Sequence, residues 1–274
     1  MSQLVAGVAT VHAPLIVGMP HLPPQERRQA VSHGWNELRE ITSGVRPDVI
    51  LCVASEHITN FLSTAAPPFC IGIGESNPTQ PEFGLPVLRV PGDPEFARGL
   101  VEYAYAREFD IAHSSELYLD HGTNLPLHFI TPDYDIPVVP LLVNTVWEPM
   151  PTAQRAHQLG ELIADYIASD GADKRVMVMA TGGISHWVGN RRHGDMNEEF
   201  DRWFLAQIAS GSNDELRTLG QQQIVDQAGD GGNEIRNWIV AAAAALASRL
   251  EPKVVLDETF VPGWNVSVYQ VVWQ

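Results

Sequence analysis

The chain has 274 residues, 45% of them hydrophobic, and carries a formal net charge of −16 at pH 7. Such an acidic surface repels polyanions, which argues against nucleic acid and anionic membranes as partners, and no run approaches the ~20 apolar residues that a membrane span needs. There is no basic and then apolar leader, and two cysteines without CxxC spacing are typical of reduced thiols, so we expect a cytoplasmic protein.

Apolar, strand-like runs alternate with helical patterns along the chain, which favours a mainly parallel or mixed sheet flanked by helices. In chain order we expect a strand at 3–11, a helix at 25–42, a strand at 48–54, hairpins or an irregular excursion in the Pro/Gly-rich stretch at 67–91, a helix at 94–109 and a strand at 136–143. There follow a helix at 152–169, a strand at 175–180, helices at 195–209, 214–223 and 234–250, and strands at 253–260 and 265–273. No repeat or linker divides the sequence, so we expect an α/β fold in a single domain over residues 1–274.

Three histidines follow three of the predicted strands: His12, His57 and His186. Ligands of open α/β sheets gather beyond the carboxyl ends of the strands, so these side chains are candidates for one shared site. Each alone is equally well explained as a hydrogen-bonded loop residue. Glu56 is a further candidate ligand or partner, but neighbours on an extended chain point to opposite sides, which favours His57 alone.

Glu234 follows a glycine-rich stretch, Gly229–Gly232, and opens the last long predicted helix. Asn233 is expected to cap this helix, and a glutamate in the first turn is itself a common structural feature that the helix dipole favours. Two imidazoles and one carboxylate on one face of a metal ion form the ligand set of non-haem Fe(II) oxygenases. Arg236 is either a solvated charge or a partner behind the site.

His121 lies in the segment Asp120–Thr123, which we interpret as a polar loop. Its functional interpretation is an acid or a hydrogen-bond donor to substrate, with Asp120 setting its tautomer, and the alternative is an ordinary turn histidine. His186 follows Gly182-Gly183, which lets the backbone approach a ligand closely.

A basic cluster, Arg191–His193, stands close to His186 in this acidic chain. It is interpreted either as a binding site for a substrate carboxylate or as a basic segment at the entrance that only balances the acidic surface.

Five segments, in this order, resemble the class III (LigB-type) extradiol ring-cleavage dioxygenases, the group of the protocatechuate 4,5-dioxygenase β subunit. They cover nearly the whole length of the chain, and as an ordered set they are more specific than a lone His-Ala-Pro. The segments are Val11–Pro14, Ser55–Phe61, Asp120–Gly122, Ala180–Trp187 and Gly231–Trp238.

The resemblance implies that His12, His57 and Glu234 bind Fe(II), that His186 is the active-site acid/base and that His121 assists at the substrate. It implies a non-haem Fe(II)-dependent extradiol dioxygenase that inserts O2 into a catechol-type aromatic ring, carboxylated or not, with meta ring opening. The implied partners are a small aromatic substrate and O2, together with either further copies of the chain in a homo-oligomer or a small α subunit.

Two rival functions remain open from the sequence. A zinc-dependent hydrolase uses the same His/His/Glu set, and the absence of an HExxH helix excludes only one subclass. A non-catalytic binding member of the same superfold is the other. The ring substituents of the substrate are not indicated by any motif.

Overall fold

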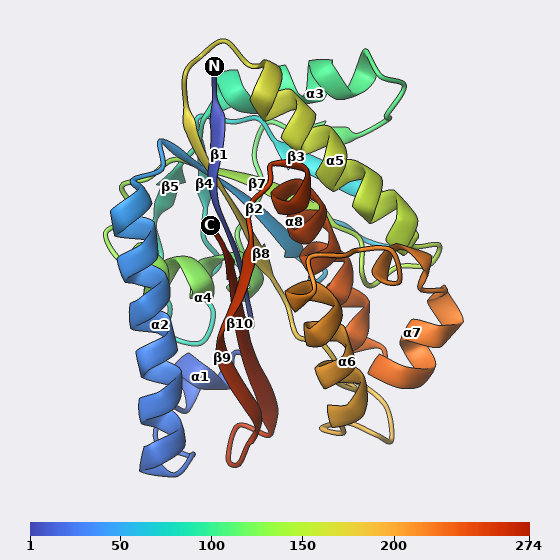
Figure 1. Ribbon diagram of the computed structural model, residues 1–274. Coiled ribbons are helices and arrows are strands. Elements are labelled where there is room, and N and C mark those ends of the chain that lie inside the picture. Colours follow the sequence, from blue (N-terminus) through green and yellow to red (C-terminus); the bar gives the residue numbers. More distant parts are fainter.

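The computed structural model describes residues 1–274, which are built around an eight-stranded mixed sheet (Figure 1). Its strand order is β6-β3-β7-β2-β8-β1-β10-β9, and the four strands β7, β2, β8 and β1 are mutually parallel. The α/β fold with a mixed sheet flanked by helices is therefore confirmed. The strands are β1 (Gln3–Thr10), β2 (Val49–Ser55), β3 (Phe69–Gly72), β6 (Ala112–Ser114), β7 (Val138–Val143), β8 (Arg175–Thr181), β9 (Pro252–Val261) and β10 (Val266–Trp273).

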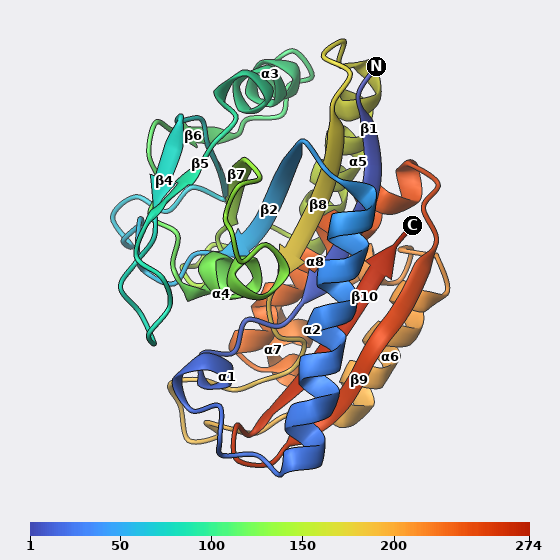
Figure 2. The ribbon, with the colours of Figure 1, turned by 90° about the vertical axis from the view of Figure 1, so that its left-hand side faces the viewer.

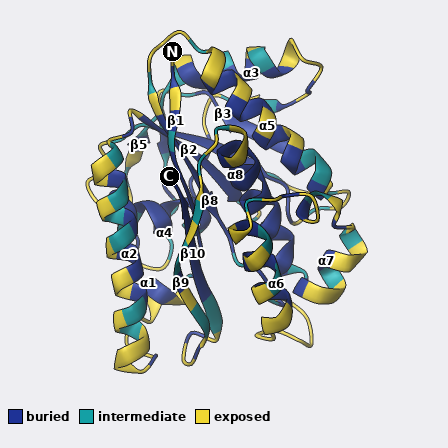
Figure 3. Ribbon diagram, in the orientation of Figure 1, coloured by how far each residue is buried: buried dark blue, intermediate teal, exposed yellow.

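The central strands are apolar along their whole length because helices cover both faces of the sheet. Every residue of β2 and β7 is buried, as expected for parallel strands covered on both sides (Figure 3). One face carries α1 (Leu15–Gly18), α2 (Gln25–Val45) and α4 (His121–Ile130). The other carries α3 (Pro94–Tyr105), α5 (Ala153–Ser169), α6 (Glu198–Ala209), α7 (Gln221–Ala228) and α8 (Ile235–Ala247).

Helix α8 packs unusually close to its neighbour α5. It is alanine-rich and buried from Ile235 to Ala245. A Cβ on Gly160 of α5 would lie 2.3 Å from the carbonyl oxygen of Val240, so only glycine permits this approach. The tight contact fixes the start of α8, where Glu234 stands. None of the helices combines the length and the apolarity that crossing a bilayer requires.

The Pro/Gly-rich stretch at 67–91, for which hairpins or an irregular excursion were expected, contains β3 and a small separate hairpin of the antiparallel strands β4 (Ser76–Pro78) and β5 (Arg89–Pro91). The segment at 120–123, interpreted as a loop, is instead the start of α4. Asp120 is the N-cap of this helix, and its side chain accepts a hydrogen bond from the backbone N–H of Gly122. Pro126 lies inside the helix and obscures it in the sequence.

Two other predicted helices and one predicted cap differ from the structure. The helix expected at 214–223 is a short 3-10 helix (Leu216–Thr218) followed by α7. The helix expected from 195 begins at Glu198, because the side chain of Asn197 caps it. Asn233 does not cap α8: it belongs to a 3-10 helix, η2 (Gly231–Glu234), and its side-chain oxygen accepts from Arg236 and Gln221 instead.

Candidate metal and substrate site

His12, His57 and His186 lie together because β1, β2 and β8 are adjacent parallel strands that end at one edge of the sheet (Figure 2). Each histidine follows the last residue of its strand by two to five positions. The three side chains that the sequence placed at strand ends therefore surround one place, between α4 and the start of α8.

Glu234 lies between two of these imidazoles. Its Oε1 is 3.2 Å from Nε2 of His12 and 3.0 Å from Nε2 of His57. The ring centroids of the two histidines are 4.9 Å apart, with the rings nearly perpendicular. The carboxylate and the His12 ring are buried, and His57 is half-buried. One carboxylate oxygen thus meets two ring nitrogens from different strands.

Hydrogen bonds from α8 to the strand ends place Glu234. Asn237 donates from Nδ2 to the Ser55 hydroxyl (2.9 Å) and to the Thr181 carbonyl (2.7 Å). The second carboxylate oxygen of Glu234 accepts from the backbone N–H of Gly183 at 2.8 Å. Gly182 has φ 145°, and a Cβ there would lie 2.8 Å from the Glu234 Cβ, so this position requires glycine.

The Nδ1 atoms of three histidines of the site also have hydrogen-bond partners. Three histidines near Glu234 each have Nδ1 engaged by an oxygen, which leaves Nε2 as the atom that faces the shared centre. Partners of this kind fix the orientation and tautomer of metal-binding histidines. The pairs are His12 with Thr181 Oγ1 (3.2 Å), His57 with Asp120 Oδ2 (3.0 Å) and His121 with Glu82 Oε2 (3.0 Å).

These pairs correct one prediction. Asp120 does not set the tautomer of His121: its carboxylate holds His57, through both the ring and the backbone N–H. The two residues are adjacent in sequence, but Asp120 caps α4 and points back to the loop after β2. Sequence proximity gave the wrong partner, and Glu82, the actual partner of His121, lies in a stretch without a recognisable motif.

The donor set fits a divalent metal ion. Ligand atoms of His12, His57 and His121 all lie within 4.8 Å of one another, and the Glu234 carboxylate joins the first two. Neutral imidazole and carboxylate are donors that iron and zinc both accept. These residues therefore form a candidate metal site. His12 and His57 are ligands in either case, and the third ligand is Glu234 or His121.

The carboxylates at this site are held as anions by positive neighbours. Burial by itself would raise the pKa of Glu234, but the charges and hydrogen bonds of His12 and His57 outweigh it and hold the pKa well below its usual value. For Asp120 burial is likewise outweighed by the nearby His57, and its pKa falls to about 2. The site therefore holds two ionised carboxylates, and a bound cation can take the place of the protons on the histidines beside them.

His186 is held differently from the other three. Its Nδ1 has no hydrogen-bond partner, and its Nε2 lies 3.8 Å from Glu234 Oε2. Its ring fills a slot between two glycines: a Cβ on Gly183 would lie 2.7 Å from Nδ1, and one on Gly231 2.2 Å from Nε2. Burial lowers the pKa of His186, so the ring is neutral and able to accept a proton.

His121 stacks on His57 with ring centroids 4.4 Å apart and lies edge-on to His12 at 5.5 Å. Burial and the neighbouring imidazoles lower its pKa to about 4. The ring is therefore neutral at pH 7. Since its Nδ1 faces a carboxylate and must carry the proton, its Nε2 is a free acceptor.

Two residues that the sequence left open now have clear positions. Glu56 is buried, and its carboxylate accepts backbone N–H groups of the loop after β2, including those of Ile58 (2.8 Å) and Thr59 (2.6 Å). Arg236 is not solvated: it is 1% exposed and donates to the Pro151 carbonyl and to Asn233. Both stabilise the loops that carry His57 and Glu234.

The basic cluster Arg191–His193 lies in an exposed loop. Arg192 pairs with Asp195 at 2.9 Å and stacks on the ring of Trp187. Arg191 has no ion pair.

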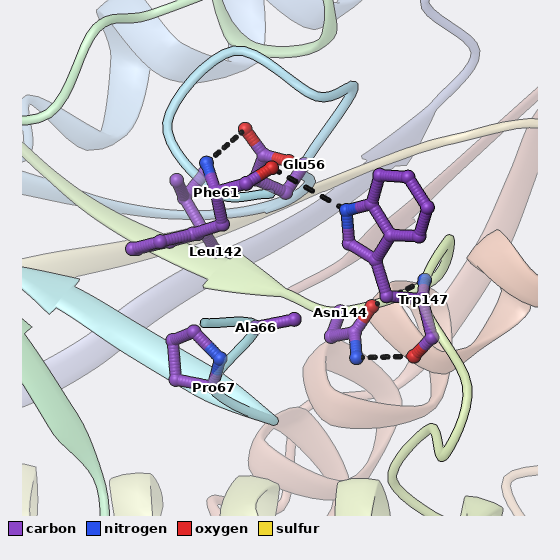
Figure 4. Close-up of a pocket in the computed structure, with 7 residues that line it drawn as sticks. All are labelled: Glu56, Phe61, Ala66, Pro67, Leu142, Asn144 and Trp147. Carbon is purple, nitrogen blue, oxygen red and sulfur yellow. Dashed lines mark hydrogen bonds between the residues drawn. The ribbon is translucent and has the colours of Figure 1, made fainter. Parts of the chain in front are cut away.

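A small cavity lies beneath the loop after β2 (Figure 4). Trp147 closes it by donating from Nε1 to the Phe61 carbonyl, and Asn144 holds the Trp147 backbone. The cavity has room for about one water molecule, so it is too small for an aromatic substrate. Its seven lining residues are Glu56, Phe61, Ala66, Pro67, Leu142, Asn144 and Trp147.

A family model described as the catalytic LigB subunit of aromatic ring-opening dioxygenase matches residues 7–269. A protein of Photorhabdus laumondii named 2,3-dihydroxyphenylpropionate/2,3-dihydroxicinnamic acid 1,2-dioxygenase is 26% identical over 281 residues, which cover 86% of this chain and 87% of that protein. A protein of the same name from Cupriavidus necator is 28% identical over 80% of this chain and 82% of its own.

The fold also resembles that of a solved structure. The crystal structure of an uncharacterized protein from Escherichia coli K12 superposes with a TM-score of 0.64 and covers 98% of this chain and 99% of its own. At 17% identity the likeness concerns the architecture alone.

Proposed function

Because the chain belongs to the LigB family of aromatic ring-opening dioxygenases, we propose that it holds Fe(II) on His12, His57 and Glu234 and opens a catechol ring next to one of its hydroxyl groups. The general class, an aromatic-ring-cleaving dioxygenase, follows from the family. The metal and its ligands are our proposal. The observation that carries it is the single Glu234 oxygen at 3.2 Å and 3.0 Å from the Nε2 atoms of His12 and His57.

Glu234 is a better third ligand than His121 for two reasons. Its oxygen lies between the other two donors, whereas His121 stacks against the ring of His57. A set of two imidazoles and one carboxylate also leaves one face of the ion open for both substrates. His121 then stands beside the open face, within reach of a bound substrate.

When bound, Fe(II) supplies the Lewis acidity that lowers the pKa of a chelated catechol and the redox chemistry that O2 needs. The protein supplies the proton transfers. His186 takes a hydroxyl proton at Nε2, the atom that faces Glu234, because burial keeps this ring neutral. With its Nδ1 free of any partner, the ring can gain and lose a proton without breaking a hydrogen bond.

His121 assists from the other side. Since its Nδ1–H is donated to Glu82, its Nε2 accepts a hydrogen bond from the second hydroxyl and orients the ring. This acceptor role replaces the donor role expected from the sequence. The relatives' names indicate a catechol that carries a short carboxylated side chain, and we propose this class of substrate for the present chain.

The proposal is tested by loading the purified chain with Fe(II) without oxygen and then following O2 uptake with 3-(2,3-dihydroxyphenyl)propionate, unsubstituted catechol, protocatechuate, 2-aminophenol and gallate. We expect about one O2 consumed per catechol and a coloured ring-open product. The Zn(II)-loaded chain is the control and should consume none. Absence of O2 uptake with every compound would refute the proposed function, and hydrolytic activity of the zinc form would favour the rival hydrolase.

That the chain forms a homo-oligomer or pairs with a small α subunit stays a prediction. Light scattering on the purified chain gives its mass in solution.

A further inference from the structure

The loop between β4 and β5, residues 79–88, reaches the candidate site (Figure 2). We call it the β4–β5 loop. Its first residues are fixed to the segment before α4: Gln80 donates its backbone N–H to the Leu119 carbonyl at 2.8 Å, and Leu119 donates to the Pro78 carbonyl at 2.8 Å. Its end is fixed by the Leu88 N–H, which donates to the Thr79 hydroxyl at 2.9 Å. The tip of the loop is therefore held beside His121.

Glu82 at this tip contacts His121 twice. A single carboxylate oxygen, Oε2, accepts the backbone N–H of His121 at 2.8 Å and lies 3.0 Å from its ring Nδ1. Two donors on one acceptor fix both the start of α4 and the rotation of the imidazole. They also require the proton of the neutral ring to sit on Nδ1. Glu82 thus determines which ring nitrogen His121 offers to the site.

Phe83, the next residue, lies beside His121. Its ring meets the His121 ring at 84° with a centroid distance of 5.4 Å. On its other side it approaches α1, where a Cβ on Gly18 would lie 3.7 Å from Phe83 Cδ1. Phe83 therefore lies between His121 and the end of α1.

Two properties of Phe83 point to a contact with a ligand. It is 48% exposed, although it is a large apolar side chain. It also has φ 51°, a left-handed conformation that is unfavourable for a bulky residue. An aromatic side chain held in this conformation, half in solvent and edge-on to a site histidine, gains burial when an apolar group binds against it.

We propose that the tip of the β4–β5 loop, Glu82 and Phe83, is one wall of the substrate site, in which Phe83 contacts the ring substituent of the catechol and Glu82 is a positioning residue for His121. The wall favours substrates with an apolar linker next to the ring over unsubstituted catechol. This inference rests on the proposed ring-cleaving function and adds to it the part of the molecule that selects the substrate.

The role of Phe83 is tested by binding without turnover. The dissociation constants of 3-(2,3-dihydroxyphenyl)propionate and of catechol are measured without oxygen on the Fe(II)-loaded chain, from the quenching of tryptophan fluorescence. For Phe83→Ala we expect about tenfold weaker binding of the substituted compound and less than about twofold change for catechol, since only the former buries its linker on the ring. Val87→Ala, exposed on the same loop, should change neither.

Equal losses for the two compounds, or equal effects of Phe83→Ala and Val87→Ala, would overturn the role of Phe83. Failure of the proposed function is recognised separately. In that case the unmodified chain would consume no O2 with either compound, while the binding comparison would still distinguish Phe83→Ala from Val87→Ala.

The role of Glu82 is tested by measuring separately how its replacement changes kcat and KM. For Glu82→Ala we expect kcat to fall about 10- to 100-fold, with KM changed less than about twofold and with unchanged iron content, because the His121 ring loses its fixed rotation and tautomer while the proposed metal ligands stay in place. Glu82→Gln retains an acceptor oxygen and should recover most of kcat. Glu75→Ala, an exposed glutamate of the same region, should have no effect.

A spectroscopic measurement separates positioning from a merely structural role. The ¹⁵N shifts of the His121 ring in the Zn(II)-loaded chain should report a proton on Nδ1 in the unmodified protein and in Glu82→Gln, and a mixture of tautomers in Glu82→Ala. Identical His121 shifts in all three proteins, or loss of iron from Glu82→Ala, would overturn the assignment.

Discussion

His57 and His186 follow two adjacent parallel strands, β2 and β8, yet the protein holds their rings in opposite ways. The Nδ1 of His57 lies 3.0 Å from the buried carboxylate of Asp120, and the ring stacks on His121. His186 has no partner at Nδ1 and is held only by the walls of a slot between Gly183 and Gly231. A hydrogen bond fixes which nitrogen faces the centre, whereas a slot fixes only where the ring lies.

The pKa values of the two histidines also differ, and they are shifted in opposite directions. Burial disfavours the charged form of both rings, but Asp120 and Glu234 outweigh it at His57, whose pKa lies well above the usual value. At His186 burial prevails and the pKa is lowered. A ring beside fixed negative charge suits a metal ligand, because a cation can take the place of the proton. A neutral, unanchored ring suits a residue that exchanges protons with substrate.

The largest expected effect comes from replacing one of the three proposed metal ligands. Alanine at His12, His57 or Glu234 should reduce the iron bound after anaerobic loading to near zero and abolish ring cleavage, since each change removes one of three proposed ligands. Iron per chain is measured by mass spectrometry after gel filtration. Unchanged iron content in all three variants would refute the ligand set.

His186→Phe should leave iron in place and lower turnover by about 10²- to 10⁴-fold, the usual contribution of general acid/base catalysis. Iron content and O2 uptake are measured on the same sample. Near-normal turnover would remove His186 from the proton transfers, and loss of iron would mean that the two histidines do not differ as described.

Gly231→Ala tests the slot itself. The added Cβ would lie 2.2 Å from His186 Nε2, so the ring must move. We expect a loss of turnover of at least about tenfold, within the range for misplacing a general base, with iron retained. Gly220→Ala, where a Cβ meets nothing within 4 Å, is the matched control. Equal activity of the two variants would show that the slot does not position the ring.

Asp120→Asn tests the anchor of His57. Asparagine still caps α4, so the fold should persist. Loss of the charged partner should weaken iron binding about 10- to 100-fold, as for other partners of metal-binding histidines. Metal affinity is measured by competition with a chelator. Asp93→Asn, which changes the N-cap of α3 away from the site, is the control, and the same affinity in both variants would contradict the anchoring role.

The smallest effect concerns Asp201, which fixes the loop before His186 by accepting the Ser185 backbone N–H at 2.8 Å. Its other oxygen has no partner, and burial raises its pKa from 3.8 to about 6. The folded state therefore holds this proton more tightly than the unfolded state, so stability falls as pH rises from about 4 to about 6.

Asp201→Asn removes this pH-dependent loss and keeps an acceptor for Ser185. It should raise the free energy of unfolding by about 3 kcal/mol at pH 8 and by less than about 1 kcal/mol at pH 4. Urea midpoints at both pH values test this. The exposed Asp133→Asn should show no such difference. A gain for Asp201→Asn that is equal at both pH values would mean that Asp201 is not the titrating group.

The sequence predicted the strand ends well because buried parallel strands are continuous apolar runs. Residues 49–55 and 175–181 are of this kind, and His57 and His186 follow them directly. Those positions, with Glu234 at the start of an alanine-rich helix, supplied the candidate residues, and the resemblance to the LigB-type dioxygenases singled out His12, His57 and Glu234 among them as metal ligands. Both the apolar runs and the alanine-rich helix can be recognised from neighbouring residues in the sequence.

What the sequence did not predict depends on contacts between distant segments. Glu82 contacts His121 across 39 positions, and Asp120 contacts His57 across 63, so neither pair leaves a local signal. The start of α4 was missed because Pro126 disrupts the helical pattern. Burial of Arg236 was also not predictable, since an arginine two residues after Glu234 is equally consistent with a solvated helix face.

Anomalous diffraction at the iron absorption edge, from crystals of the Fe(II)-loaded chain grown without oxygen, tests the central claim most directly. We predict a single strong peak within bonding distance of Nε2 of His12, Nε2 of His57 and a carboxylate oxygen of Glu234, with His121 and His186 unbound beside it. A peak elsewhere, or one bound by His121 in place of Glu234, would contradict the proposed site.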